Sequence, residues 1–372
     1  MQNKEYYFNY LYGWWKNIDK SILFIILSLF SLGLFFSLVS TSLIASDKLE
    51  TNSYYFFIKH FIFVIIGLCC LFSFSILNQK QLYDLSRILF ICFFLLLVLV
   101  PFIGVEVKGS KRWIDIAFLP RLQPIELLKP FLIIIIALAL TLGKYQNKYL
   151  NYFLSLFVVF PVVVFLVVQP DLGQSILILL TWLILIFISG VNLFIFFSFF
   201  FILIGSTSYL IYFVPKFEYI KTRIFSFLDP SSGNNYQSEK ASEAIIGGGF
   251  FGKGVGEGTL NNRIPEAHTD YIVSVISEEF GIIIVLLILL IFLFFAFQVV
   301  KKISLEEDNK TKLILMGSIS LLILQTFVHI GVNIRILPTT GMTLPFLSYG
   351  GSSIISNSIL SGIILNLTRR KV

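Results

Sequence analysis

Long apolar runs separated by short polar segments dominate the chain. A helix needs about 20 apolar residues to cross the roughly 30 Å hydrocarbon core of a bilayer. No segment shows the strict alternation of a transmembrane β-barrel strand. The pattern therefore predicts an all-α, polytopic membrane protein with ten transmembrane helices, over residues 21–45, 57–76, 85–104, 125–143, 149–168, 173–190, 192–213, 270–300, 313–335 and 345–367.

Composition supports this fold class and excludes others. The 372 residues are 57% hydrophobic and only 13% charged, whereas a soluble domain is about 45–50% apolar and about 25% charged. Cys69, Cys70 and Cys92 all lie in apolar runs, so we expect no disulfide framework. No basic, aromatic-interleaved stripe suggests nucleic-acid binding. No linker or convincing repeat divides residues 1–372, which we interpret as a single domain.

The distribution of cations predicts the orientation. An even number of spans places both termini on one side, and that side holds fourteen of the 28 Lys and Arg residues. Eleven of the others lie in only two segments, 108–129 and 216–263, while the remaining short loops of that side are nearly bare. Short loops determine topology, so we expect cytoplasmic termini and one large extracytoplasmic loop at about 215–269. Its cations suggest an anionic ligand, or else contact with anionic headgroups.

The first outer polar segment precedes the predicted fourth span. Lys111, Arg112 and Trp113 stand in the loop, and Gln123 comes just before Pro124, which suits the first turn of a helix. Glu126 and Lys129 are then one turn apart on one face, close to the membrane surface. They can form a simple structural ion pair or part of a ligand site.

A second outer region extends from the glycine-rich stretch 247–258 into the predicted span 270–300. Seven glycines in twelve residues favour either an anion-binding backbone nest or a flexible turn. We expect a helix opening at Asp270, capped by His268 or Thr269. Its first turns would place Asp270, Ser274 and Ser277 on one face. Carboxylates at membrane depth are costly and usually functional, although Asp270 could simply complement the helix dipole.

The third outer region, 333–353, contains two prolines and three glycines around a span entrance, which predicts a broken helix there. Protein groups or water must then satisfy the freed backbone. His60 and His329 are isolated within spans, so a zinc site is not expected.

Together these motifs resemble the SEDS family of bacterial cell-wall polymerases, the group of FtsW, RodA and SpoVE. The resemblance covers nearly the whole chain and is closest to the FtsW branch. Two positions depart from the family pattern: Ile125 replaces a usual Ser, and Tyr271 replaces a usual Phe. The segments that carry the resemblance are 108–113, 123–126, 169–173, 235–237, 265–270, 278–281 and 344–353.

The resemblance implies a peptidoglycan glycosyltransferase in the bacterial cytoplasmic membrane. Lipid II, a disaccharide pentapeptide on undecaprenyl pyrophosphate, would be polymerised into β-1,4 glycan on the outer face by an inverting mechanism. Asp270 would be the general base, and cations would stabilise the pyrophosphate leaving group. The implied substrate-binding residues are Lys111, Arg112, Trp113, Gln123, Glu126, Lys129, Arg263, Glu266, His268, Ser348 and Tyr349.

The resemblance also bears on cofactors, partners and alternatives. The resemblance allows a divalent cation, Mg²⁺ or Mn²⁺, and implies no organic cofactor. Glu126 could either help to hold this cation or orient Lys129. The expected partners are a class B penicillin-binding protein, divisome proteins at the division septum and membrane lipids, with no nucleic acid. A lipid II flippase and an elongation-type RodA polymerase are the alternatives. A flippase should carry charge through the bilayer's midplane, whereas this sequence concentrates charge at the outer mouth.

Overall fold

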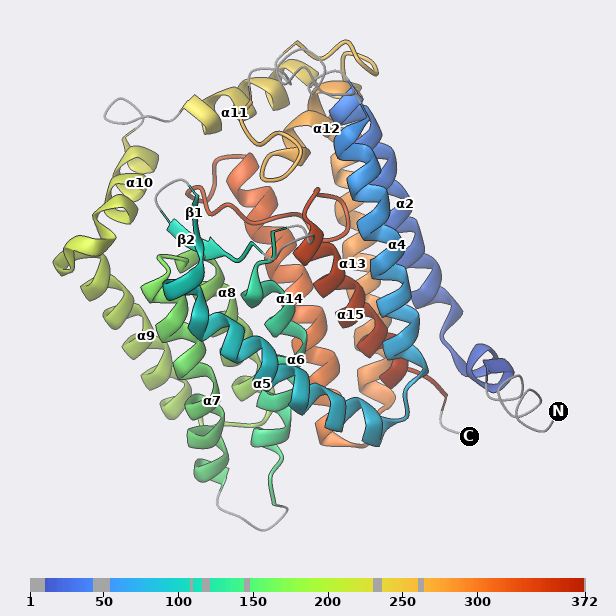
Figure 1. Ribbon diagram of the computed structural model, residues 1–372, viewed down its shortest axis with the longest axis vertical. Helices are drawn as coiled ribbons and strands as arrows, with labels where there is room; N and C mark the ends of the chain where they lie inside the picture. Colours follow the sequence, from blue (N-terminus) through green and yellow to red (C-terminus); the bar gives the residue numbers. More distant parts are fainter. Residues whose placement is uncertain are drawn as a thin grey trace.

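The computed structural model describes residues 11–42, 54–107, 110–115, 121–143, 148–229, 236–259 and 264–370, most of them in long helices that run side by side (Figure 1). The long helices are α2 (Lys20–Ser42), α4 (Tyr55–Ile76), α5 (Gln79–Ile103), α6 (Pro124–Leu140), α7 (Lys148–Val168), α8 (Leu172–Ile188), α9 (Leu193–Phe213), α13 (Ile282–Leu305), α14 (Asn309–Asn333) and α15 (Gly351–Leu367). The short elements are β1 (Val105–Val107), β2 (Ser110–Trp113), η1 (Pro215–Phe217), α10 (Glu218–Leu228), α11 (Tyr236–Gly248) and α12 (Ile272–Phe280).

Each of the ten predicted spans overlaps a helix. Within the described ranges, seven helices are long and apolar enough to cross a membrane, namely α2, α4, α5, α7, α9, α13 and α14. The helices α6, α8 and α15 have 17 residues each, slightly fewer than a perpendicular crossing requires. The chain is thus a multi-pass membrane protein, while the number of ten crossings stays a prediction.

Burial separates central helices from peripheral ones. In α6 and in α15, 15 of 17 residues are buried, and α15 packs against both α4 and α6. In α9, by contrast, no residue is buried, so this helix lies at the edge of the bundle. Polar side chains on α6 and α15 therefore have to find their partners inside the protein.

Polar caps extend several helices beyond their apolar runs. The predicted span 85–104 begins earlier in the structure, at Gln79, because the Asn78 side chain accepts a hydrogen bond from the Gln81 N–H and the Gln81 side chain accepts one from the Asn78 N–H. This reciprocal arrangement satisfies two of the free N–H groups of a helix start. Asp308 similarly caps α14.

The all-α prediction needs one correction. The loop before α6 contains an antiparallel β-hairpin, in which β1 pairs with β2 and Val107 lies opposite Ser110. Alternation over only three or four residues is too short to stand out in the sequence. Outside the long helices, α11 crosses the end of the bundle together with α12 (Figure 1).

The prediction of one helix from Asp270 to about residue 300 is wrong. The helix is broken at Gly281, where φ is 83°, into α12 and α13. Neither His268 nor Thr269 caps α12, because its N-cap is Tyr271. Asp270 precedes the helix, so the predicted face shared with Ser274 and Ser277 is not formed.

The last predicted span is also shorter than expected. Residues 334–350 form turns and irregular chain, and α15 begins only at Gly351. The interruption predicted around the two prolines is therefore present, but it occupies more of the segment than expected.

The two described chain ends lie together. The Arg370 N–H donates to the Asn17 carbonyl at 3.1 Å, and both ends are at the bottom of Figure 1, opposite α11 and α12. This fits an even number of crossings. The assignment of this end to the cytoplasm stays a prediction.

The break at Gly281 leads to a stability prediction. In Gly281→Ala the new Cβ would lie 2.1 Å from the Phe250 carbonyl oxygen, at a positive φ with extended ψ that costs an L residue about 1–3 kcal/mol by itself. We expect a clearly lower thermal midpoint in detergent. Gly205→Ala is the control, because its Cβ meets nothing within 4 Å and Ala favours the interior of α9. Equal midpoints for the two variants would contradict this account.

Candidate functional site

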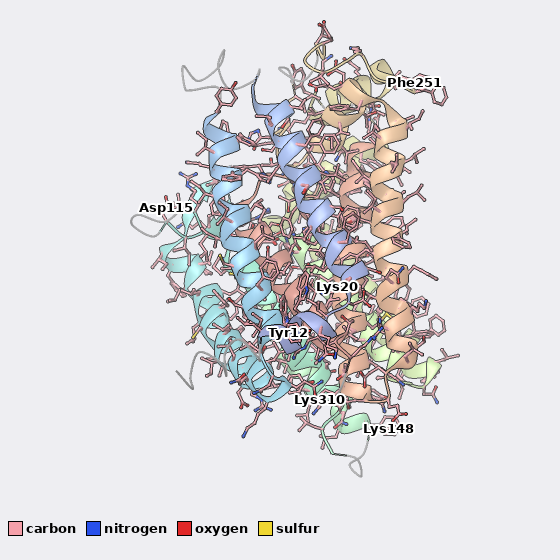
Figure 2. The ribbon with its side chains drawn as sticks, turned by 90° about the vertical axis from the view of Figure 1, so that its right-hand side faces the viewer. Tyr12, Lys20, Asp115, Lys148, Phe251 and Lys310 are labelled. Carbon is pink, nitrogen blue, oxygen red and sulfur yellow. The ribbon has the colours of Figure 1, made fainter. Side chains whose placement is uncertain are left out.

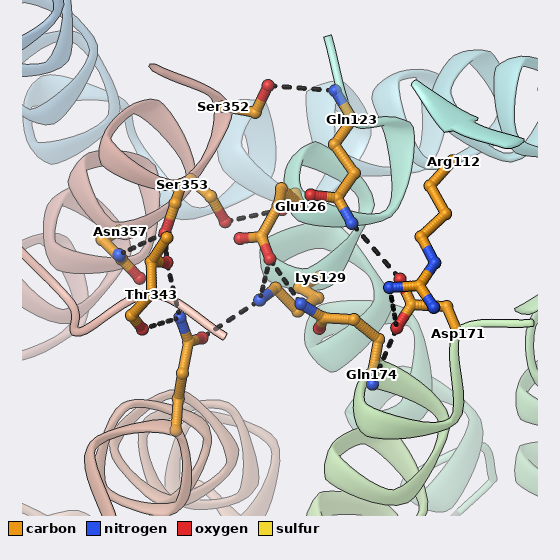
Figure 3. A network of polar contacts seen from close by, with 12 residues as sticks. Arg112, Gln123, Glu126, Lys129, Asp171, Gln174, Thr343, Ser352, Ser353 and Asn357 are labelled. Carbon is orange, nitrogen blue, oxygen red and sulfur yellow. Dashed lines mark hydrogen bonds and ion pairs between the residues drawn. The ribbon is translucent and has the colours of Figure 1, made fainter. Parts of the chain in front are cut away.

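Two polar clusters are candidates for the functional site. The first, here the Glu126 network, joins α6, α8, α14 and α15 (Figure 3). The second, here the Asp270 turn, comprises residues 266–271 before α12. The irregular segment 334–350 contacts both.

The Glu126 network is centred on a buried ion pair. Helix α6 starts with Pro124, which puts Glu126 and Lys129 one turn apart, with Nζ and Oε1 separated by 2.9 Å. Their side chains are 5% and 0% exposed. Gln174 donates to the same Glu126 oxygen at 2.6 Å, and Lys129 also donates to Gln325 at 3.1 Å. Buried charges require such partners, so the ion-pair interpretation holds.

Glu126 is the partner of Lys129 through one oxygen only. Its Oε1 accepts from Lys129 and Gln174, while its Oε2 is buried without a hydrogen-bond partner among the described residues. Across the described ranges, no three His, Cys, Asp or Glu side chains lie together in a way that could hold a metal ion. A metal held by protein ligands alone therefore does not fit the residues described.

Hydrogen bonds extend the network into α14, α15 and the irregular segment. The Gln325 amide donates to the Thr343 carbonyl at 2.9 Å, and the Thr343 hydroxyl lies 2.7 Å from that of Ser353. The Ser356 hydroxyl donates to the Glu126 carbonyl at 2.6 Å. The first helical turns of α6 and α15 are thereby tied together.

At its outer edge the network includes an arginine and a second carboxylate. Asp171 caps α8, accepts from Gln123 at 3.3 Å and lies 3.7 Å from the Arg112 guanidinium. Arg112 also donates to the Pro170 carbonyl. Asp171 is in the connection between α7 and α8, where burial raises the pKa of its carboxyl and the Arg112 charge opposes that rise.

The Asp270 turn is fixed through its backbone. The Glu266 carbonyl accepts from the N–H groups of Thr269, Asp270 and the next residue. The Asn333 amide, completely buried at the end of α14, donates to the Asp270 carbonyl at 3.0 Å and accepts from the Ser274 hydroxyl at 2.9 Å. Asn333 thus holds Asp270 and the first turn of α12 in a fixed relation.

The irregular segment supports the same turn from its other side. The Ser348 hydroxyl donates to the Thr269 carbonyl at 2.7 Å, and the Tyr349 N–H donates to the His268 carbonyl at 3.0 Å. The His268 ring lies 5.7 Å from the Tyr349 ring, centroid to centroid. Burial lowers the pKa of His268, with the negative charge of Glu266 opposing, so the imidazole is neutral near pH 7.

The Asp270 carboxylate faces this segment rather than the apolar exterior. Its Oδ2 lies 3.5 Å from the position that a Cβ on Gly341 would take, and the residue is half-buried. Burial raises the pKa of the neighbouring Tyr271 to about 12, and the negative charge of Asp270 adds to this rise while the positive charge of Arg223 opposes it. Arg223 also donates to the Thr339 carbonyl at 3.4 Å. A carboxylate and a guanidinium thus share this environment.

The predicted site residues fall into four groups. The Glu126 network contains Arg112, Gln123, Glu126 and Lys129. The Asp270 turn and the adjoining segment contain Glu266, His268, Asp270, Ser348 and Tyr349. Lys111, which is exposed, and Trp113 lie in the hairpin on β2, outside both clusters. Arg263 lies outside the described residues.

Sequence reasoning missed several members of these clusters. Gln325 and Asn333 are amides within the apolar run of α14, where a polar side chain signals a functional or structural contact. Asp171 stands in a motif that carried the family resemblance but was not assigned to the site. The residues missed are Asp171, Gln174, Arg223, Gln325, Asn333, Thr343, Ser353 and Ser356.

Comparison with known proteins identifies a family over almost the whole chain. Residues 20–372 match the family model FTSW_RODA_SPOVE, described as cell cycle protein. Probable peptidoglycan glycosyltransferase FtsW of Caulobacter vibrioides is 30% identical, over 96% of this chain and 91% of the relative. The protein of the same name from Coxiella burnetii is 35% identical, over 94% and 95%.

Solved structures share the fold. One, described as "Structural coordination of polymerization and crosslinking by a peptidoglycan synthase complex", has a TM-score of 0.77 and 26% identity, covering 94% of this chain and 97% of that chain. The crystal structure of the rod shape determining protein RodA of Thermus thermophilus has a TM-score of 0.69 and 24% identity, over 94% and 96%.

The buried ion pair leads to a prediction about stability. In Lys129→Met the Glu126 carboxylate stays buried without its counter-charge, which costs about 3–5 kcal/mol. The double variant Glu126→Gln/Lys129→Met leaves no unpaired charge, so we expect it to recover most of the loss. Thermal midpoints of the purified proteins in detergent measure both.

The matched control is the exposed pair of Arg87 and Asp84, whose side chains are 57% and 51% exposed. Arg87→Met should change the free energy of unfolding by no more than about 1 kcal/mol. If Lys129→Met were as mild as this control, the ion pair would not stabilise the bundle.

Proposed function

Because this chain belongs to the FtsW/RodA/SpoVE family, also called SEDS, we propose that it is a peptidoglycan glycosyltransferase of the bacterial inner membrane that polymerises lipid II during cell division. The names of its FtsW relatives support the activity and the branch. The observation that carries the mechanism is the Asp270 turn, which hydrogen bonds from Asn333 and Ser348 hold in place, with the carboxylate directed at a polar segment.

In the proposed reaction Asp270 is the general base. Its carboxylate takes the proton of the acceptor sugar hydroxyl while that oxygen attacks the anomeric carbon of the donor. The bond between this carbon and the pyrophosphate oxygen breaks, and undecaprenyl pyrophosphate leaves with the electron pair. An α-linked donor then gives a β-linked product in one displacement, so no covalent enzyme intermediate is required.

Cations would stabilise the negative charge that develops on the pyrophosphate. Arg112, with its side chain 20% exposed, and the exposed Lys111 can meet a ligand from solvent. Lys129 is buried against Glu126, so we assign it to fixing the segment 334–350 through Gln325. Arg263 stays a proposed contact by resemblance. A divalent cation, if one takes part, would be bound mainly by the pyrophosphate oxygens.

We also propose that the chain works with a transpeptidase. The similar solved structure is described as a peptidoglycan synthase complex that coordinates polymerization and crosslinking, which supports a class B penicillin-binding protein as partner. Other divisome proteins at the septum and membrane lipids complete the proposed surroundings.

A lipid II flippase is the second candidate. The buried pair Glu126–Lys129 is the observation in its favour, because it places charge inside the helical bundle. The pair lies in the first two turns of α6, however, the helix that follows the hairpin in the chain. This position suits an outer-face site better than a path across the membrane.

The general-base role predicts the effect of Asp270→Asn. The purified protein with its class B penicillin-binding protein is given labelled lipid II, and glycan output is measured. We expect a fall of about 10²-fold or more, because the amide cannot accept the proton. Asp84→Asn, at an exposed site in the second turn of α5, should retain wild-type output.

Two results would count against the proposal. Equal glycan output from Asp270→Asn and wild type, at equal thermal midpoints, would remove Asp270 from the mechanism. Transfer of lipid II between the leaflets of a liposome without any polymer would favour the flippase over the polymerase.

A further inference from the structure

The turn after α11 exposes large apolar side chains. Phe250 and Phe251 are 72% and 84% exposed, and Ile246, one helical turn before Phe250, is also exposed. We call these three residues the Phe tip. Single exposed apolar side chains are ordinary, but a group of three at one place marks a surface that contacts something other than water.

Backbone hydrogen bonds and close packing hold the turn that carries the Phe tip against α12 and the start of α13. The Lys253 N–H donates to the Glu278 carbonyl at 2.9 Å, and the Ile282 N–H donates to the Gly249 carbonyl at 3.0 Å. Gly252 comes so close to α12 that a Cβ there would lie 2.1 Å from the Glu279 carbonyl oxygen. The glycines thus allow two backbones to pack directly, which favours an ordered turn over a flexible one for residues 249–254.

The same contacts argue against an anion-binding nest. The N–H groups of Gly249, Gly252, Lys253 and Gly254 donate to backbone carbonyls within the protein. The Lys253 ammonium is paired with Glu278, which is fully buried, at 2.8 Å. These four N–H groups and the Lys253 ammonium are therefore already paired within the protein, and the large side chains that the turn exposes are apolar.

The Phe tip continues the apolar surface of α13. Its neighbour Ile282 begins that helix, and the first turns of α13 expose Ile283, Leu286 and Leu287. Figure 2 shows Phe251 projecting sideways near the outer end of α13, not along the helix axes. The exposed side of α11 changes along the helix, since Gln237 and Glu243 lie on it before Ile246.

From this continuity we propose that the Phe tip is seated in the outer interface of the lipid bilayer, at the boundary of headgroups and acyl chains. Aromatic side chains collect at this depth in membrane proteins. The contact would fix α12, and with it the turn that carries Asp270, at a constant height above the lipid. The inference depends on the membrane topology and not on the glycosyltransferase reaction.

Spin-label accessibility in vesicles tests the proposal. Cys69, Cys70 and Cys92 are replaced by Ala, and a nitroxide is attached to Phe251→Cys in the full-length protein in phosphatidylethanolamine and phosphatidylglycerol vesicles. Collision with oxygen reports lipid, and collision with a neutral nickel chelate reports water. The lipid reference is Leu286→Cys on α13, and the water reference is Glu243→Cys on α11.

We expect the ratio of oxygen to nickel accessibility at position 251 to exceed that at position 243 by several-fold and to approach that at position 286. A ratio equal to that at position 243 would place the Phe tip in water and overturn the proposal. Low accessibility to both reagents would show a protein cover, such as a second copy of the chain, and would overturn it as well. Thermal midpoints of the labelled variants must match that of the cysteine-free parent.

Discussion

The buried pair of Glu126 and Lys129 is the interaction on which the centre of the structure depends. Two charges inside an apolar bundle are tolerated only when they are paired and hydrogen-bonded. That requirement brings Gln174 from α8 and Gln325 from α14 to the same place. It also explains why helix α15, which lies against α6, carries hydroxyl and amide side chains at buried positions.

The backbone of segment 334–350 is subject to the same requirement that buried polar groups have partners. An irregular chain inside a membrane bundle leaves carbonyl and N–H groups without helical partners. Side chains of Gln325, Ser348 and Arg223 satisfy some of them. Because Gly33 has no side chain, α2 can approach the Phe346 carbonyl closely. The result is a rigid loop that touches the Glu126 network on one side and Asp270 on the other.

The outer layer is built by a different means. Around α11 and α12, glycines bring backbone against backbone, and the buried carboxylate of Glu278 accepts from Lys253 and from the Thr259 N–H. A layer made this way holds its shape without a large apolar core of its own. It leaves apolar side chains such as Phe251 free to face the lipid, and it supports α12 directly after Asp270.

The sequence by itself determined the membrane class, the approximate place of each long helix and the family, because the length of an apolar run reports on bilayer thickness and the motifs are contiguous. It also predicted that Glu126 and Lys129 lie one helical turn apart, and it singled out Asp270 as the candidate base. It did not reveal the break at Gly281 or the partnership of Lys129 with Gln325, which are 196 residues apart in the chain. Those features follow from close contacts between segments that are distant in the chain. Hydrophobic periodicity shows that a helix face is buried but does not show which segment packs against it, so only the tertiary structure decides them.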